Sequence, residues 1–291
     1  MKINKNYINY SNKLIKNREK IYDNLKNLRL VNKKNVLFTS KIIYHNEINY
    51  LTNLYLAENI KYHFNKKYSG LNRSINLIKR LPNLTPNGIL KVRKETQLIY
   101  NLITKFLFKS LEDLSIKFAT AAYPVIRIKT GESNSKRPYS TSKLHSDSWV
   151  GQYGDAIASF GVEGDFKKNT VKFYAPSKVS HDFFKKIDDY TLGLKKFTGL
   201  EYIAKLNKGY FIIFDHCVLH KTVTEKNCNP RISIDFGVKF DSSVKRSVKN
   251  GDIKRWEYVR FEKYKYIGAK SLIISSDLVD YKKNSKKFIN I

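Results

Sequence analysis

The residues from 115 to 240 form a succession of short apolar runs separated by glycine, asparagine and proline, and this pattern limits what the chain can fold into. The runs include GDAIASFGVEG, TVKFYAP, GYFIIFDH and RISIDFGVKF. In the last run apolar and polar residues alternate from Arg231 to Phe236, which is typical of a strand with one buried face. The pattern predicts a β core, and the lack of a repeat of fixed period disfavours solenoids and propellers.

The residues before this region have the spacing of helices instead. Over residues 91–114 five apolar side chains recur with a period near 3.6 residues, which predicts a long helix with a buried face. These side chains are Ile99, Leu102, Ile103, Phe106 and Leu107. Similar spacing predicts a surface helix over residues 7–31 and further helices over 48–66 and 74–81.

These patterns divide the chain into three parts. We expect a mainly helical region at 1–114, a β core at 115–240 and a C-terminal extension at 241–291 that completes or covers the core. A chain of 291 residues with 42% hydrophobic residues is long and apolar enough for a sizeable core.

The net charge of +30 raises the question of a nucleic-acid partner. Only 11 of the 55 basic residues are arginine, whereas nucleic-acid sites favour arginine clusters interleaved with aromatics. We therefore do not expect a nucleic-acid partner. The start of the chain lacks a secretory apolar region and no apolar run reaches about 18 residues, so we expect a cytoplasmic protein without a membrane span.

Two histidines lie in motifs that a metal would explain. In LHSDSW, His145 and Asp147 are two residues apart, so on an extended segment they point to the same side. His220, on a neighbouring strand, would be the third ligand. Two histidines and one carboxylate form the facial triad that binds non-haem Fe(II). His216 competes for this role, but only His220 stands eleven residues before Arg231. The alternative interpretation is that LHSDSW binds no metal and forms a turn in which the aspartate side chain caps the backbone.

Two residues after His220 could together bind a ligand carboxylate. A two-stranded hairpin would return the Arg231 guanidinium toward the metal, and arginine binds carboxylates with two parallel hydrogen bonds. Thr222 lies on the same strand face as His220 and could donate its hydroxyl to that carboxylate.

Together these motifs resemble the Fe(II)/2-oxoglutarate-dependent dioxygenases, most closely the phytanoyl-CoA dioxygenase branch. Five landmarks occur in the order of that family, within about residues 118–240: LHSDSW, NTVKFYAPSKVSH, KGYFIIF, HCVLHKT and the step to Arg231. The resemblance implies a double-stranded β-helix, a cupin-like jelly roll whose open end holds the metal. It also implies Fe(II), 2-oxoglutarate as cosubstrate, O2 and hydroxylation of a small metabolite of sugar type or with an anionic group.

The resemblance assigns His145, Asp147 and His220 as iron ligands, and Arg231 with Thr222 as anchors of the distal 2-oxoglutarate carboxylate.

Three further residues are candidates for the substrate pocket: Trp149, Arg127 and Asn169. Trp149 either lines the pocket or packs in the core. Arg127 and Lys129 alternate toward one face, where they reach the cosubstrate, an anionic substrate or solvent.

Two other functions compete with this interpretation. A cupin-like metal enzyme or isomerase would use the barrel without 2-oxoglutarate and would not need Arg231. A non-catalytic basic protein would bind polyanions with a steep dependence on salt.

Overall fold

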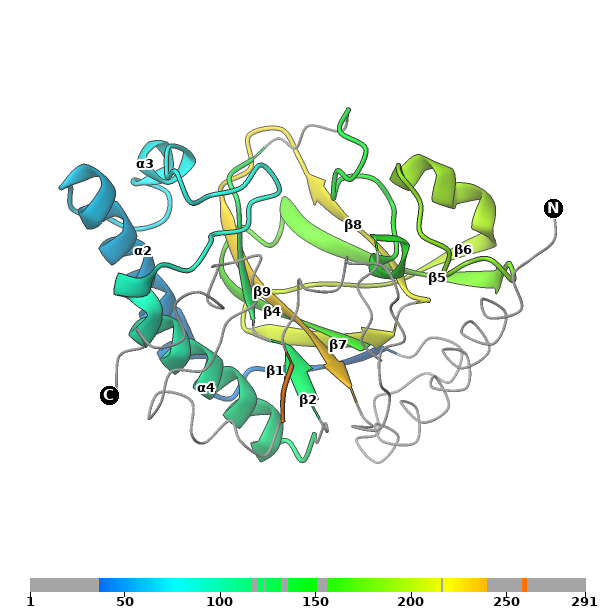
Figure 1. Ribbon diagram of the computed structural model, residues 1–291, viewed down its shortest axis with the longest axis horizontal. Coiled ribbons are helices and arrows are strands. Elements are labelled where there is room, and N and C mark those ends of the chain that lie inside the picture. The colour runs from blue at the N-terminus through cyan, green and yellow to red at the C-terminus, as the bar shows by residue number, and fades with distance from the viewer. Residues whose placement is uncertain are drawn as a thin grey trace.

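The computed structural model describes residues 37–116, 120–122, 124–131, 136–150, 156–215, 217–239 and 258–260. The helix predicted over 7–31, the competing His216 and most of the predicted C-terminal extension lie outside these residues. Figure 1 shows two antiparallel sheets with helices to one side. No helix in the described part of the chain has the length and apolar character needed to cross a bilayer.

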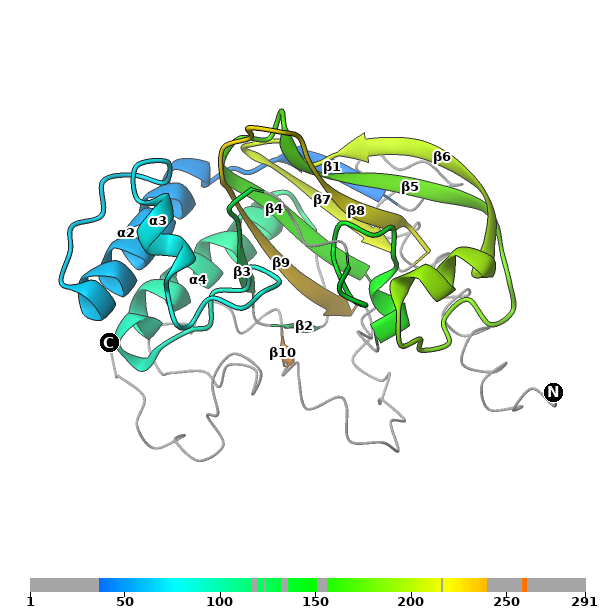
Figure 2. The same cartoon turned by 90° about the horizontal axis from the view of Figure 1, so that it is seen from above.

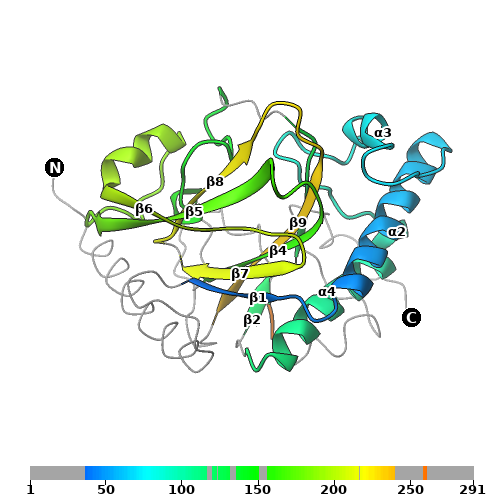
Figure 3. The same cartoon turned by 180° about the vertical axis from the view of Figure 1, so that it is seen from behind.

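The large sheet has seven strands, all paired antiparallel. Its spatial order is β1 (Leu37–Lys41), β7 (Tyr210–Asp215), β4 (Ala156–Gly164), β9 (Arg231–Lys239), β2 (Thr120–Ala122) and β10 (Tyr258–Arg260), while β3 (Val125–Lys129) pairs with the first half of β9. Figure 3 shows β1 and β7 side by side at one edge of this sheet. The sequence analysis did not identify β1 as a strand.

The small sheet faces the large one and has the order β6 (Phe197–Lys205), β5 (Asn169–Val179), β8 (Leu219–Thr224). A backbone bridge between His145 and His220 adds the segment around His145 to the free side of β8. After β3 in the large sheet, the chain passes to the His145 segment beside the small sheet and returns to the large sheet as β4. It then forms β5 and β6 in the small sheet, β7 in the large sheet, β8 in the small sheet and β9 in the large sheet. Repeated passage between two facing sheets is a jelly roll, so the predicted double-stranded β-helix is confirmed.

The outer face of the large sheet carries the helices. Figure 2 shows α2 (His45–Phe64), α3 (Ile75–Lys79) and α4 (Gln97–Asp113) on the side away from the small sheet. The apolar side chains of β9 pack there in one cluster with those of α2 and α4, and the Phe108 and Phe236 rings lie 5.2 Å apart. The helices predicted over 48–66, 74–81 and 91–114 are therefore present, with α4 starting only after a 3₁₀ turn at Lys94–Thr96.

The period-2 alternation of β9 gives its two faces opposite character. Ile232, Ile234 and Phe236 face the helices. Arg231, Ser233 and Asp235 therefore point into the space between the sheets, where they meet side chains of β3 and β4. One part of this space is filled by an apolar cluster that includes Phe173, Phe214, Ile212 and Leu206. The polar part lies around His145 and Arg231.

Candidate metal centre

Three side chains that can ligate a metal converge between the sheets. His145 and His220 are held by reciprocal backbone hydrogen bonds of 3.0 and 2.9 Å. Asp147 begins the 3₁₀ helix Asp147–Val150, so it lies on a turn and not on the extended segment that we expected. Its carboxylate oxygens lie 3.8 Å from Nε2 of His145 and 3.7 Å from Nε2 of His220.

These separations suit a shared cation. They are too long for hydrogen bonds but shorter than twice a metal–ligand bond of about 2.1 Å. The potential ligand atoms of the three residues all lie within 4.8 Å of one another. Two imidazole nitrogens and one carboxylate oxygen form the donor set of non-haem Fe(II) centres. The residues present therefore fit the metal that the sequence predicted.

His145 is prepared for this role by its surroundings. Its Nδ1–H donates to the carbonyl of Lys143 at 2.7 Å, which leaves Nε2 directed at Asp147. The ring of Tyr190 stacks on the imidazole, with centroids 4.2 Å apart. Burial, with His220 as a further cause, lowers the pKa of His145 to about 3. The imidazole is therefore neutral at physiological pH, as a metal ligand must be.

Arg231 lies on the same inner surface, at the start of β9, and is only 1% exposed. Its Nη1 donates to Ser233 Oγ at 2.8 Å, while its buried Nε has no acceptor among the described residues. Burial is the main cause that lowers the pKa of Arg231, to about 10. Thr222 is buried on β8, two residues after His220, and its backbone N–H donates to the Thr141 carbonyl at 2.6 Å.

Arg127 also faces this space. Its Nε donates to Asp235 at 2.5 Å, and the other oxygen of Asp235 accepts from Ser159 Oγ at 2.7 Å. Burial opposes the charge of the guanidinium, but Asp235 and Asp147 outweigh it, so the pKa of Arg127 lies above its ordinary value. The side chain keeps an exposed fraction of 17% and thus borders accessible space.

The other two pocket candidates have structural contacts. Trp149 is fully buried and packs edge-on against Phe183, with centroids 5.6 Å apart. The Asn169 amide donates to the carbonyls of Lys129 and Asn229 at 3.0 and 3.1 Å, which ties the start of β5 to the end of β3. Their assignment to a substrate pocket stays a prediction.

Three residues of this region were missed by the sequence analysis. Ser233 and Asp235 follow Arg231 on the same alternation, so the strand pattern carried a signal for both. Tyr190 reaches His145 from a separate 3₁₀ helix, Tyr190–Lys196, and nothing in the local sequence indicates this contact.

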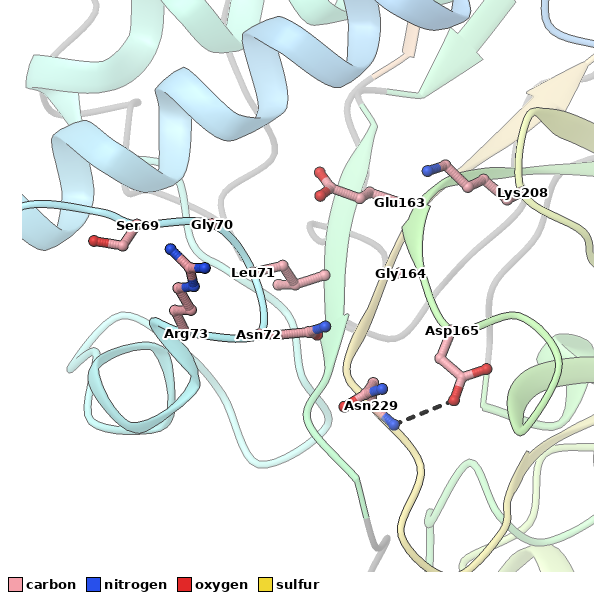
Figure 4. Close-up of a pocket in the computed structure, with 10 residues that line it drawn as sticks. All are labelled: Ser69, Gly70, Leu71, Asn72, Arg73, Glu163, Gly164, Asp165, Lys208 and Asn229. Carbon is pink, nitrogen blue, oxygen red and sulfur yellow. Dashed lines mark hydrogen bonds between the residues drawn. The ribbon is translucent and has the colours of Figure 1, made fainter.

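A pocket lies near the end of β4 and the start of β9 (Figure 4). Both of its carboxylates are engaged by the protein: Asn53 donates to Glu163, and the backbone N–H groups of residues 167, 168 and 229 donate to Asp165. None of the three metal-ligating candidates lines this pocket. The chemistry predicted from the sequence is thus concentrated between the two sheets.

The sequence matches no protein-family model and none of the curated proteins. Among solved structures, the chain is similar to SnoK, a non-haem alpha-ketoglutarate-dependent carbocyclase from nogalamycin biosynthesis (10% identity, 77% of this chain and 88% of that chain, TM-score 0.40). It is also similar to EctD from S. alaskensis (12% identity, 71% and 74% coverage, TM-score 0.38) and to the epimerase SnoN (9% identity, 80% and 91% coverage, TM-score 0.36). At such low sequence identity and TM-score, these similar structures assign neither a substrate nor a reaction to this chain.

The chain's own geometry is more informative. It has a jelly roll built from two facing antiparallel sheets, with His145, Asp147 and His220 together between them. The chain therefore combines a jelly-roll barrel with a 2-His-1-carboxylate group, the two features that the sequence resemblance implies.

Proposed function

We propose that this chain is a non-haem Fe(II)- and 2-oxoglutarate-dependent dioxygenase that hydroxylates a small anionic or sugar-type metabolite. The observation that carries the proposal is the convergence of His145, Asp147 and His220 on one point inside the barrel. The buried Arg231 on the same inner surface supports 2-oxoglutarate as the cosubstrate, because the described residues offer its Nε no acceptor and a carboxylate would supply one.

Each residue has a definite task in this proposal. His145 and His220 offer neutral nitrogens, and Asp147 offers the negative charge that a divalent ion needs. Tyr190 fixes the plane of His145 by stacking, and the bond to the Lys143 carbonyl fixes its tautomer. Arg231 and Thr222 hold the distal carboxylate of the cosubstrate. When bound, iron and 2-oxoglutarate supply the activation of O2 for attack on a C–H bond.

Arg127 supports an anionic or hydroxyl-rich substrate. Its Nε is fixed by Asp235, while its Nη1 and Nη2 have no acceptor among the described residues. A guanidinium held in this way presents donors in a fixed direction, which suits a carboxylate, a phosphate or a pair of sugar hydroxyls.

The test is succinate formation from 2-oxoglutarate in air, with and without Fe(II). We expect iron-dependent succinate from the wild type, none from His145→Ala or His220→Ala, and a much higher requirement for 2-oxoglutarate in Arg231→Ala. Circular dichroism shows whether each variant is folded.

Other outcomes would favour the competing functions. Metal binding without succinate, unaffected by Arg231→Ala, would indicate a cupin-like enzyme or isomerase. Absence of both metal and 2-oxoglutarate binding, with salt-dependent binding of polyanions, would indicate a non-catalytic basic protein.

A further inference from the structure

Two buried cations lie directly opposite each other on neighbouring strands of the large sheet. Lys129 on β3 and Arg231 on β9 are cross-strand partners, and their side chains are 6% and 1% exposed. Directly opposed residues of an antiparallel pair have Cβ atoms about 5 Å apart, and like charges there destabilise the sheet. Lys129 and Arg231 are called the cationic pair below.

In the part of the chain that the structure describes, no carboxylate bonds to either member of this pair. Lys129 Nζ donates to Thr141 Oγ1 at 2.7 Å, and Arg231 Nη1 donates to Ser233 Oγ at 2.8 Å, so both acceptors are neutral hydroxyls. Asp235, the carboxylate that raises the pKa of both Lys129 and Arg231, accepts hydrogen bonds from Arg127 and Ser159 instead. Among the described residues, neither member of the pair forms a salt bridge.

The unfavourable electrostatics of this arrangement affect the pKa of the Lys129 ammonium group. Burial, followed by Arg127, Arg231 and Arg137, lowers the pKa of Lys129 to about 7, while Asp235 acts in the opposite direction. Buried charges without a partner are costly, and a fold retains them where a ligand supplies the missing charge.

Lys129 is also joined to the other predicted anchor. Thr141, which accepts from the Lys129 ammonium through its hydroxyl, accepts from the Thr222 backbone N–H through its carbonyl at 2.6 Å. Lys129 and Thr141 from one side, Thr222 from β8 and Arg231 from β9 thus lie in one connected group. This group contains two hydroxyls, those of Thr141 and Thr222, and two cations, all of which can donate to an anion.

We propose that Lys129 is a second cation of the cosubstrate site, and that its ammonium binds the distal carboxylate of 2-oxoglutarate together with Arg231. This inference rests on the proposed function. A carboxylate has enough lone pairs to accept from both cations at once. Its charge offsets the repulsion within the cationic pair, so the site favours an anionic ligand over an apolar one.

The test is isothermal titration of 2-oxoglutarate into the Mn(II)-loaded protein under argon. Lys129→Met removes the charge and the hydrogen bond, whereas Lys129→Gln keeps a donor for Thr141 and removes only the charge. We expect both variants to bind 2-oxoglutarate about 10- to 100-fold more weakly than the wild type, the loss expected for one charge-assisted hydrogen bond. Lys178→Met, at an exposed lysine of β5, is the matched control and should bind like the wild type.

Two further measurements separate a role in binding from a role in packing. We expect 2-oxopentanoate, which lacks the distal carboxylate, to bind the wild type and Lys129→Gln equally. We also expect the ligand-free Lys129→Met protein to melt no lower than the wild type, because the change removes a buried charge. Both results would support the inference.

Wild-type affinity for 2-oxoglutarate in Lys129→Met and Lys129→Gln would overturn the inference and leave the proposed function intact. An equal loss of affinity for 2-oxopentanoate would overturn it as well, because the change would then act on the whole site. Failure of the wild type itself to bind 2-oxoglutarate would instead contradict the proposed function.

Discussion

The two faces of β9 differ in what they do for the molecule. The outer face places Ile232, Ile234 and Phe236 in the apolar cluster beneath the helices. The inner face carries Arg231, Ser233 and Asp235, where charges are buried beside other charges. One strand therefore packs in the core through one face and carries the proposed binding residues on the other. A shift in register of one residue would exchange the faces and remove both.

The largest expected effect is on the outer face. Phe236→Ala removes a ring that packs against Phe108 and Phe160, so we expect a loss of about 3–5 kcal/mol in the free energy of unfolding, measured with urea. The inner face provides the control, because Ser233→Ala removes only a hydroxyl that accepts from Arg231. Equal losses of stability in the two variants would mean that the faces do not differ.

The next effect is on metal affinity. Asp147→Ala removes the only carboxylate of the triad, and we expect Mn(II) affinity to fall more than about 100-fold in an anaerobic titration. Its melting temperature should stay near that of the wild type, since Asp147 lies on a turn outside the apolar clusters. Unchanged Mn(II) binding would exclude the triad as the metal centre.

A smaller effect tests the apolar support behind the metal centre. A Cβ at Gly193 would lie 2.0 Å from the ring of Trp149, which shares a 3₁₀ helix with Asp147. We expect Gly193→Ala to cost about 1–3 kcal/mol of stability and to weaken Mn(II) binding in the folded fraction. Loss of stability without any change in Mn(II) binding would show that Trp149 does not help to position Asp147.

The smallest effect is the pH dependence of the ligand-free protein. The pKa of Lys129 is lowered to about 7, so between about pH 7 and 10 the unfolded chain binds more protons than the folded one. The contribution of this group to stability therefore rises with pH across that range. We expect Lys129→Met to flatten the rise in melting temperature between pH 7 and 9, with Lys178→Met as control. The same slope in all three proteins would contradict this assignment.

The sequence contained the local part of this structure. Alternation identified β9, the 3.6-residue period identified α4, and the spacing of His145 and Asp147 indicated the metal motif. These features can be predicted from the sequence because each depends on residues only a few positions apart.

Contacts between distant segments could not be predicted from the sequence. The stacking of Tyr190 on His145 and the pairing of Lys129 with Arg231 depend on register, which is set only when the whole barrel closes. Asp147 shows the same limit, because its 3₁₀ helix contains Trp149, which packs in an apolar cluster with residues distant in the sequence.

The pairing of β1 with β7 determines when the barrel can be completed during synthesis. Leu37 pairs with Phe214, and the Thr39 hydroxyl bonds to the Phe211 carbonyl 172 residues away. Because contacts across so many residues form slowly, β1 must wait on the ribosome until most of the chain has emerged. During that interval the backbone N–H and C=O groups of Leu37–Lys41 that later bond to β7 lack that partner and form an exposed strand edge.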